Sequence, residues 1–526
     1  MNKRTLTHLL TALSLLLCSA QSHASSPDPE QLAQRIDQTV AEVMASYAVP
    51  GVAIAVVEGQ QVVFANTYGV QEYGKAAPVT ADSLFKIASV SKNFTTAALA
   101  LLIDEGKLSW DDRVIDHLPE FRTSDPWITA EFRVRDLLIH SSGLNLGAGD
   151  LMFWPTPNDF TRTDILKGLK YLPMDRGFRS RYAYDNILYV LAGELTERVA
   201  GMAWEDFVEQ RLLQPLGMQA CFAGIVPEQQ RVLLAQPHGD IDGVPTVVRR
   251  DFADQRIPSV AAGGMRCSQS AMIEWMKMQL ARGRYSDAEG NQLTLISSKN
   301  HAEMWKPQTL TGVGSQMQQW NNTLFGAYGY GWRINDVDGQ LLIHHTGTLH
   351  GMNAYLGFLP QRNVGFLVLM NKSNSDARTT LIQTLIKSYT STEQQDWLAM
   401  TKAWRAQQTI RRAARFTEPT TQAVDPASIP PLLGVYRDPW FGDISIEQQQ
   451  QSLRLRSHRS SRIAGELFHV SGTTYVVRWD DRTHEADAYV RFTTTMSGAI
   501  DGMLIEKIDP AADFSFNFED LRLRKL

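Results

Sequence analysis

Two groups of strand-like segments lie roughly 300 residues apart, with mostly helical sequence between them. The first group is 52–57 and 62–64, and the second is 332–334, 341–343, 354–359 and 364–369. All are short, apolar and bounded by turn residues, a pattern typical of β-strands. Since strands must pair to satisfy their backbone groups, we expect one antiparallel sheet that joins both ends of an α+β domain and is flanked by helices. We assign residues 26–390 to this domain.

The last hundred or so residues have a different pattern. A polar helical stretch and a proline-rich linker occupy 391–430, and from 431 to 526 apolar and polar residues alternate. The alternating residues are Ile444/Ile446, Leu453/Leu455, Tyr475/Val477/Trp479, Ala488/Val490/Phe492 and Phe514/Phe516/Phe518. A period of two with glycine-containing turns predicts about seven short antiparallel strands in a small β-barrel or sandwich.

Residues 1–24 have the features of a secretory signal peptide. Two basic residues precede a short apolar stretch that ends at Leu17, and small residues near Ala24 provide a cleavage site. Cys18 suggests a lipoprotein instead, but Leu17 stands before it, where lipoprotein processing normally uses a small residue. We therefore expect a soluble, secreted protein, periplasmic if the source is Gram-negative.

Charge and hydropathy exclude some classes of partner. The formal net charge is −5 and there is no long basic run, which argues against a nucleic-acid partner. After the signal peptide, no stretch reaches the ~18 apolar residues that a membrane helix needs. An oxidising compartment permits a disulfide between Cys221 and Cys267, although two buried thiols fit the sequence as well.

The segment from Ser89 to Lys92 has the clearest catalytic chemistry. If a helix begins near Ser89, these two residues lie one turn apart on the same face. The helix that follows is apolar enough to be buried, and desolvation favours a neutral lysine, which can act as a general base. Ser-x-x-Lys is a common pattern, however, and alone it also fits a capping serine beside a surface lysine.

Two further polar motifs follow Ser89-x-x-Lys92 along the chain. Tyr184-Asp185-Asn186 lies about 95 residues later, and His345-Thr346-Gly347 follows an apolar strand. With these three motifs the chain resembles the serine β-lactamase and penicillin-binding family, in its class C-like branch of esterases and D-aminopeptidases. The stretches that carry the resemblance are 84–92, 136–144, 184–186, 215–218, 263–264, 330–332 and 345–348. Residues 434–526 resemble, less closely, the lipocalin-like β domain of some D-amino-acid peptidases.

The resemblance implies a role for each motif residue. Ser89 would attack the substrate carbonyl, and Lys92 and Tyr184 would transfer its proton, the phenol pKa being lowered by the neighbouring ammonium. Asn186 would bind the acyl group and hold Lys92. The backbone N–H groups of Ser89 and Thr348 would form the oxyanion hole. The strand residues His345, Thr346 and Gly347 would bind an extended substrate.

The third motif departs from the family pattern. His345 stands where β-lactamases and carboxypeptidases usually have a lysine that supplies a positive charge for a substrate carboxylate. A histidine near pH 7 is mostly neutral, which favours a substrate without a carboxylate next to the scissile bond. His344, His345 and His350 have no carboxylate or cysteine at ligand spacing, so we predict no metal. We expect His140 to support a loop.

The sequence thus predicts a hydrolase that works through an acyl-serine intermediate without a metal or organic cofactor. Its substrate would be a small molecule or short peptide, and peptidase or amidohydrolase activity on short or D-residue-containing peptides is favoured. A carboxylesterase is the alternative, and a β-lactamase is less favoured because of His345. The alternative to an enzyme is a non-catalytic protein that binds peptides or peptidoglycan. The sequence leaves the oligomeric state open.

Overall fold

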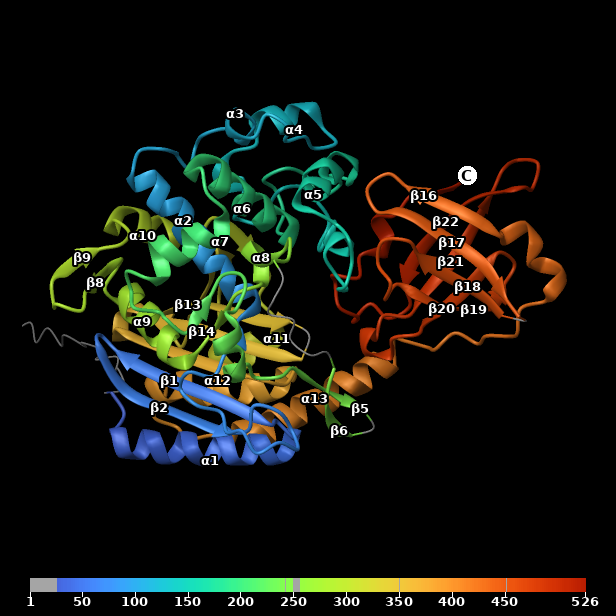
Figure 1. Ribbon diagram of the computed structural model, residues 1–526. Coiled ribbons are helices and arrows are strands. Elements are labelled where there is room, and N and C mark those ends of the chain that lie inside the picture. Colours follow the sequence, from blue (N-terminus) through green and yellow to red (C-terminus); the bar gives the residue numbers. More distant parts are fainter. Residues whose placement is uncertain (1–25, 242, 249–255, 350, 451) are drawn as a thin grey trace, which may run out of the picture.

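The computed structural model describes residues 26–241, 243–248, 256–349, 351–450 and 452–526. The signal peptide predicted at 1–24 and His350 lie outside the described residues. The chain forms an α+β domain joined to a β-barrel by helix α13 (Trp397–Ala413), which Figure 1 shows between the two. No described helix is long and apolar enough to cross a membrane.

An antiparallel sheet of eight strands forms the centre of the first domain. Strand β1 pairs with β15 from Val52 opposite Met370 to Glu58 opposite Val364, which confirms that the sheet joins the two ends of the domain. In spatial order the strands are β10 (Thr309–Thr311), β11 (Gly326–Tyr328), β12 (Arg333–Val337), β13 (Gln340–Leu349), β14 (Met352–Leu359), β15 (Val364–Met370), β1 (Gly51–Glu58) and β2 (Gln61–Gly69).

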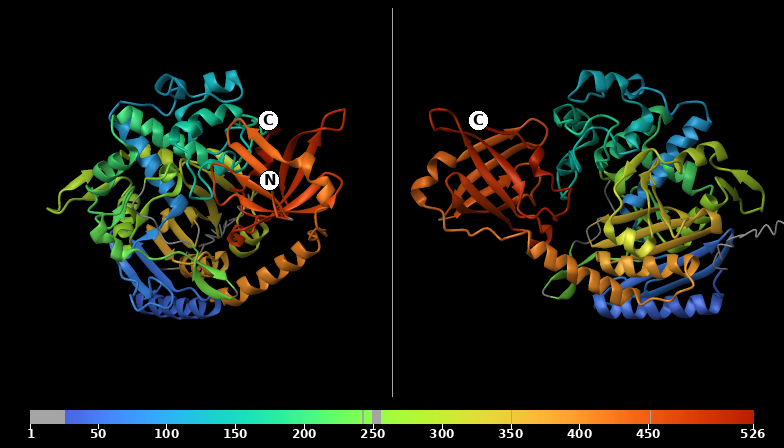
Figure 2. Two further views of the ribbon diagram at one scale, coloured as in Figure 1. Left: turned by 45° about the vertical axis from the view of Figure 1, so that its right-hand side comes forward. Right: turned by 180° about the vertical axis from the view of Figure 1, so that it is seen from behind.

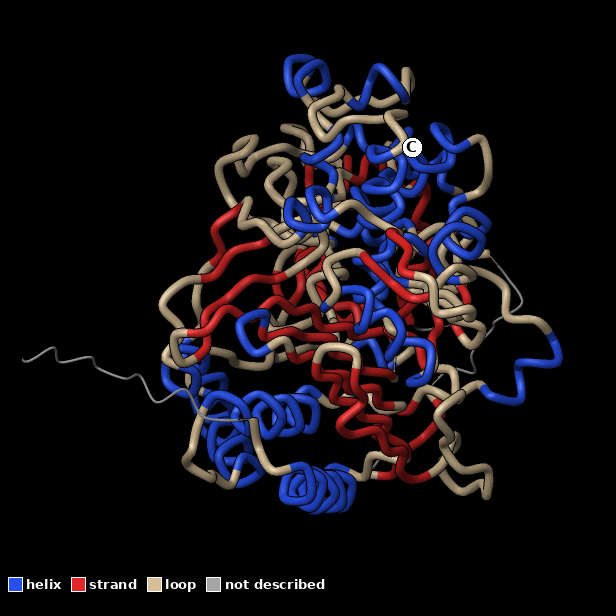
Figure 3. The backbone as a smooth tube through the Cα atoms, turned by 90° about the vertical axis from the view of Figure 1, so that its left-hand side faces the viewer, coloured by secondary structure: helices blue, strands red, loops and turns tan. Residues whose placement is uncertain are grey.

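Helices cover both faces of this sheet, as Figure 3 shows. On one face α1 (Pro29–Tyr47) and α12 (Ser375–Thr390) pack against Val52, Ile54 and Val56. On the other, α2 (Ser91–Asp104) and α9 (Gln269–Leu280) belong to the core that contains the alternate residues of β1. Because successive side chains of a strand point to opposite faces, burial on both sides explains why β1 is apolar almost throughout.

The remaining elements of this domain are short, except for α6. The helices are α3 (Val114–His117), α4 (Pro126–Glu131), α5 (Arg162–Gly168), α6 (Asn186–Ala200), α7 (Trp204–Val208), α8 (Val260–Gly263), α10 (Ser298–Met304) and α11 (Ser315–Asn321). Small sheets pair β3 (Phe85–Lys86) and β4 (Cys221–Phe222) with β7 (Arg266–Cys267), β5 (His238–Ile241) with β6 (Val244–Val247), and β8 (Arg284–Ser286) with β9 (Gln292–Thr294). A disulfide bond joins Cys221 to Cys267 across two of these strands.

The C-terminal domain is a closed antiparallel barrel, seen beside the first domain in both views of Figure 2. Its strands are β16 (Gly434–Asp438), β17 (Gly442–Gln449), β18 (Ser452–Ser457), β19 (Ala464–Ser471), β20 (Thr474–Trp479), β21 (Ala488–Thr494), β22 (Ile500–Lys507) and β23 (Leu523–Lys525). Four of the five alternating segments predicted from the sequence lie in these strands, namely in β17, β18, β20 and β21, which confirms the prediction for them.

The fifth place, Phe514/Phe516/Phe518, is not a strand. These residues form a loop and a short 3₁₀ turn, Phe518–Asp520, between β22 and β23. Phe516 and Phe518 are buried, and the ring of Phe516 packs against Trp154 of the first domain. The Phe516 ring also packs against His484, and the Phe518 ring packs against Trp479 of the barrel. The alternation there reflects aromatic packing on a loop and not a strand.

Candidate active site

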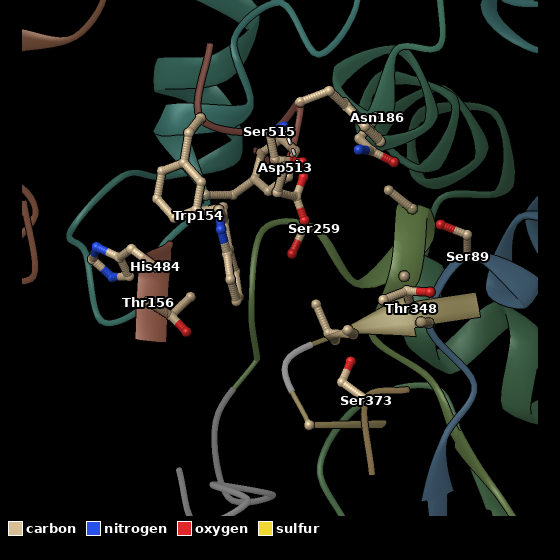
Figure 4. Close-up of a pocket in the computed structure, with 18 of the residues that line it drawn as sticks. Ser89, Trp154, Thr156, Asn186, Ser259, Thr348, Ser373, His484, Asp513 and Ser515 are labelled. Carbon is tan, nitrogen blue, oxygen red and sulfur yellow. Dashed lines mark hydrogen bonds between the residues drawn. The ribbon is translucent and has the colours of Figure 1, made fainter. Parts of the chain in front are cut away.

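A cleft of about 1820 Å³ lies between the two domains. Ser89, Tyr184, Asn186 and Thr348 line it from the first domain, and residues 511–516 line it from the barrel. Figure 4 shows Ser89 beside Thr348 at the end of β13, with Ser515 across the cleft near Asn186. The structure therefore brings the three sequence motifs together at one site.

Ser89 lies in a tight turn rather than at the start of the α-helix. Ala88–Val90 form one 3₁₀ turn, and α2 begins at Ser91, two residues later than expected. Ala88 has a φ of 47°, a left-handed conformation that an L-residue adopts only with strain. The turn directs the Ser89 side chain into the cleft while keeping it next to Lys92.

Lys92 is completely buried on α2. Its Nζ donates to Asn186 Oδ1 at 2.7 Å, to the Ala262 carbonyl at 2.7 Å and to Ser89 Oγ at 3.3 Å. Burial lowers the pKa of Lys92 to about 7, with Asp150 acting in the opposite direction. A lysine that is partly neutral near pH 7 is able to accept a proton from the adjacent hydroxyl.

Tyr184 lies beside Lys92 but in a different electrostatic state from the one predicted. The Lys92 Nζ is 4.9 Å from the centre of the Tyr184 ring. Burial raises the pKa of the phenol, and this outweighs the lowering by Arg333 and by the Ser89 side chain. The prediction that the ammonium would lower this pKa is therefore wrong, because the desolvated site disfavours a phenolate more than one ammonium favours it.

His140 supports the segment that carries Tyr184. Its ring lies 4.1 Å from the Tyr184 ring, and its Nδ1 accepts the backbone N–H of Asp185 at 3.0 Å. Burial lowers its pKa far below the ordinary value, so the ring is neutral. This contact agrees with the expectation that His140 holds a loop.

Asn186, the first residue of α6, connects Lys92 to a residue that the sequence did not reveal. While its Oδ1 accepts from Lys92, its Nδ2 donates to Asp150 Oδ2 at 2.8 Å. Asp150 is fully buried, and burial raises its pKa to about 7. No motif surrounds Asp150 in the sequence, so only its position in the fold identifies it.

The strand β13 runs past the Ser89 turn with the third motif. Gly347 packs directly on the backbone that precedes Ser89, and a Cβ there would lie 2.2 Å from the Ile87 carbonyl oxygen. Thr346 and Thr348 line the cleft on either side of Gly347. A side chain at 347 would push the strand away, which explains the glycine in this motif.

His345 is buried and neutral. Its Nδ1 is 2.7 Å from the Thr346 carbonyl, which only accepts, so Nδ1 carries the hydrogen and Nε2 accepts from the Tyr328 hydroxyl at 2.9 Å. Burial, with help from Arg333, lowers the pKa of His345 well below its usual value. The lack of a positive charge on His345 agrees with the sequence analysis.

The site nevertheless contains a fixed cation, Arg333, which the sequence analysis missed. It is the first residue of β12, lines the cleft, and lies 5.5 Å from the Tyr184 ring. Its guanidinium also lies 5.9 Å from the Tyr328 ring, and among the described residues no carboxylate forms an ion pair with it. Arg333 therefore supplies a positive charge in the cleft that the neutral His345 does not. In the sequence, the one feature that marked Arg333 was its place directly after Tyr330-Gly331-Trp332.

The arrangement has the groups that acyl transfer requires. A hydroxyl lies beside a desolvated amine, a neutral phenol faces both, and a strand edge with small residues borders the cleft. Among the described residues, no three His, Cys, Asp or Glu side chains are grouped to bind a metal.

Comparisons with known proteins agree with this geometry. Residues 36–390 match the family described as Beta-lactamase, and residues 418–525 match a domain of unknown function, DUF3471. Penicillin-binding protein 4 of Amycolatopsis lactamdurans is 28% identical over 61% of this chain and 81% of its own length. The D-alanyl-D-alanine-carboxypeptidase/endopeptidase AmpH of Escherichia coli is 24% identical over 68% of this chain and 90% of its own.

One solved structure resembles both domains together. The octameric penicillin-binding protein homologue from Pyrococcus abyssi covers 94% of this chain and 99% of its own, with a TM-score of 0.57 and 20% identity. At this identity the likeness concerns the fold. The family match, which spans most of the chain, identifies the protein: it belongs to the beta-lactamase family of serine hydrolases.

Proposed function

We propose that Ser89 is the nucleophile of a peptidase that acts on short peptides, including those with D-residues. The observation that carries this proposal is the position of Lys92, which is buried, held by Asn186 and Ala262, and 3.3 Å from the Ser89 hydroxyl. A binding protein would have no need of a desolvated amine beside a serine.

In the proposed reaction the Ser89 oxygen attacks the substrate carbonyl while its proton passes to neutral Lys92. The backbone N–H groups of Ser89 and Thr348 stabilise the oxyanion. Tyr184, which stays protonated because its pKa is raised, gives its proton to the leaving amine and recovers one from Lys92. The C–N bond breaks and leaves an acyl-Ser89 ester, which water then hydrolyses with the same groups acting in reverse.

Arg333 supports a substrate that carries a carboxylate. An unpaired guanidinium in a desolvated cleft is costly, and no carboxylate in the described part of the chain forms an ion pair with Arg333. A planar anion would satisfy it by a bidentate hydrogen bond. A peptide C-terminus is such an anion, and the similar protein from Escherichia coli is named as a carboxypeptidase and endopeptidase. We therefore favour peptides with a free C-terminus near the scissile bond.

Carboxylesterase activity is the second candidate. The same acyl-enzyme chemistry cleaves esters, and the neutral His345 makes no demand for charge on the substrate.

Export is a separate proposal that rests on residues 1–24, and the disulfide between Cys221 and Cys267 fits an oxidising compartment. Fractionation of the source cells tests it.

The first test is intact-mass spectrometry of the protein after exposure to a fluorophosphonate. We expect one adduct on the wild type and none on Ser89→Ala, while Ser259→Ala, which changes another serine of the cleft, labels normally. Turnover of p-nitrophenyl acetate, D-Ala-p-nitroanilide and N-acetyl-D-Ala-D-Ala then separates esterase, aminopeptidase and carboxypeptidase. Normal labelling of Ser89→Ala would contradict the proposed nucleophile.

A further inference from the structure

The barrel inserts a loop into the active site of the other domain. Residues 513–516, between β22 and β23, place the Phe514 ring 5.7 Å from the Tyr184 ring. The backbone there comes so close to Gly147 that a Cβ on this glycine would lie 2.6 Å from the Phe514 carbonyl oxygen. The Gly147 N–H in turn donates to the Tyr184 carbonyl at 2.9 Å. The loop is therefore packed on the segment that supports Tyr184.

A chain of hydrogen bonds leads from this loop to the lysine. Ser515 Oγ donates to Asp150 Oδ2 at 2.7 Å, and the same carboxylate oxygen accepts from Asn186 Nδ2 at 2.8 Å. Asn186 Oδ1 then accepts from Lys92. A residue of the barrel thus supplies one of the two hydrogen bonds that the Asp150 carboxylate accepts from described residues, and it does so from a position that Figure 4 shows facing Asn186.

Polar contacts between the two domains hold this loop in place. Asn145 Nδ2 donates to Asp520 Oδ1 at 2.9 Å, and Asn517 Nδ2 donates to the Leu146 carbonyl at 3.3 Å. Elsewhere on the barrel, Arg459 pairs with Asp159 at 2.6 Å. These contacts join the barrel to residues 145–146 and to Asp159, so they hold the loop against the first domain.

We propose that Ser515 of the barrel is a positioning residue for the hydrolase, acting through Asp150 and Asn186 on Lys92. This inference rests on the proposed roles of Ser89 and Lys92. It makes the barrel a part of the active site: the loop fixes the carboxylate that orients the asparagine and sets the charge that Lys92 experiences.

The direction of the electrostatic effect follows from the charges that face these groups. Asp150 faces Lys92 on α2, Asp185 before α6 and Asp513 of the barrel, while Arg333 on β12 faces Lys92. The Ser515 hydroxyl stabilises the charged form of Asp150. Without it the carboxylate protonates more readily, and Lys92 loses part of the negative potential that stabilises its ammonium. The amine then becomes neutral at a lower pH.

The test measures the second-order rate of Ser89 labelling by a fluorophosphonate between pH 5.5 and 9, in the full-length protein. Asp150→Asn should move the midpoint of the pH profile down by about one unit, since it removes the facing charge. Ser515→Ala should move it in the same direction by less, and should lower the maximal rate about threefold or more through looser positioning. Ser515→Thr keeps the hydroxyl and should restore both values.

Ser497→Ala, in an exposed turn of the same barrel, is the matched control and should leave the profile unchanged. A Ser515→Ala profile identical to that of Ser497→Ala, or a midpoint shifted upward, would overturn the proposal. Should Ser515→Ala fail to fold, an unshifted midpoint in Asp150→Asn overturns it equally. Failure of the proposed function is separate, because it would appear as no labelling of the wild type or as labelling of Ser89→Ala.

Discussion

Gly347 of β13 lies against Ile87, so closely that a methyl group in place of its hydrogen would stand 2.2 Å from the Ile87 carbonyl oxygen. Ile87 precedes the turn that carries Ser89, and Thr348 follows Gly347. The distance between the two proposed oxyanion donors, the N–H groups of Ser89 and Thr348, therefore depends on the absence of a side chain at 347.

The substitution Gly347→Ala is expected to displace β13 and to lower kcat/KM about 100-fold, the cost of a misplacement near 1 Å. Fluorophosphonate labelling and substrate turnover measure this effect, and circular dichroism checks the fold. Gly312→Ala, where a Cβ has nothing within 4 Å, serves as the control. Equal activity of both variants would show that the strand has room to yield.

The pH dependence of activity should report Lys92. Burial lowers its pKa to about 7, and only the neutral amine accepts a proton, so kcat/KM should rise with pH through a midpoint near 7. Lys92→Arg keeps the positive charge but cannot deprotonate, and it should abolish turnover. Lys86→Arg, on the wall of the same cleft, should behave as the wild type. An activity independent of pH between 5.5 and 8 would exclude Lys92 as the base.

Removal of the Tyr184 hydroxyl should slow the reaction without unfolding the protein. A general acid contributes a factor of about 10² to 10⁴, and we expect kcat of Tyr184→Phe to fall by about 10² or more while the ring keeps its contacts with His140 and Phe514. Because its pKa is raised, the wild type should show no loss of activity from phenol ionisation up to pH 9.

The control for this experiment is Tyr182→Phe, which changes the neighbouring tyrosine of the cleft. If both variants lose activity equally, the effect reports packing and not proton transfer. Steady-state kinetics on an amide and an ester substrate separate packing from proton transfer further. An amine is a poor leaving group that needs a proton from Tyr184, whereas a phenolate leaves without one, so loss of proton transfer should slow the amide more than the ester.

Arg333 should determine whether the enzyme prefers acids to amides. We expect the wild type to cleave N-acetyl-D-Ala-D-Ala faster than its C-terminal amide, and Arg333→Gln to lose about tenfold more activity on the acid than on the amide. Arg333→Lys keeps the charge without the planar donors and should recover part of the preference. A ratio of the two rates that is unaltered in Arg333→Gln would contradict carboxylate recognition.

Stability should fall in acid through buried histidines, of which His301 is the simplest to test. Burial lowers its pKa to about 4, whereas the unfolded chain binds a proton at the ordinary pKa near 6.5. Between these values the unfolded state holds more protons, so the contribution to stability is complete above about pH 6.5 and is lost as the pH falls toward 4.

Urea unfolding at pH 7.5 and at pH 5 measures this effect. His301→Gln keeps a donor for Gln279 and should remove about 2 kcal/mol of the acid-induced loss seen in the wild type. His117→Gln, at a half-buried position, is the control. The same loss in His301→Gln as in the wild type would mean that other groups cause the acid sensitivity.

Much of the fold could be predicted from the sequence because local patterns determine it. The apolar strands 52–57 and 364–369 indicated one sheet, and β1 and β15 pair as expected. Alternation in the C-terminal region indicated barrel strands. It failed at Phe514, Phe516 and Phe518, because these rings lie on a loop that packs against both domains, Phe516 against Trp154 and Phe518 against Trp479.

The motif residues could be predicted for a different reason. Ser89 and Lys92 are one turn apart in the chain, so their proximity is a local property. Tyr184 and Asn186 are distant in sequence and were predicted only because their spacing resembles a known family. The direction of the Tyr184 pKa could not be predicted, since burial depends on every element that surrounds the phenol.

The sequence by itself determined the two domains, the paired strands and the order of the three motifs, because these follow from hydrophobic periodicity and short-range spacing. Only the tertiary structure decided what surrounds Lys92. Asp150, Arg333 and Ser515 come from a 3₁₀ turn, a strand and a loop of the other domain, and none stands in a local pattern that marks it. Electrostatic interactions act through space over several ångströms, so the charge state of the site depends on contacts that the linear order of residues does not record.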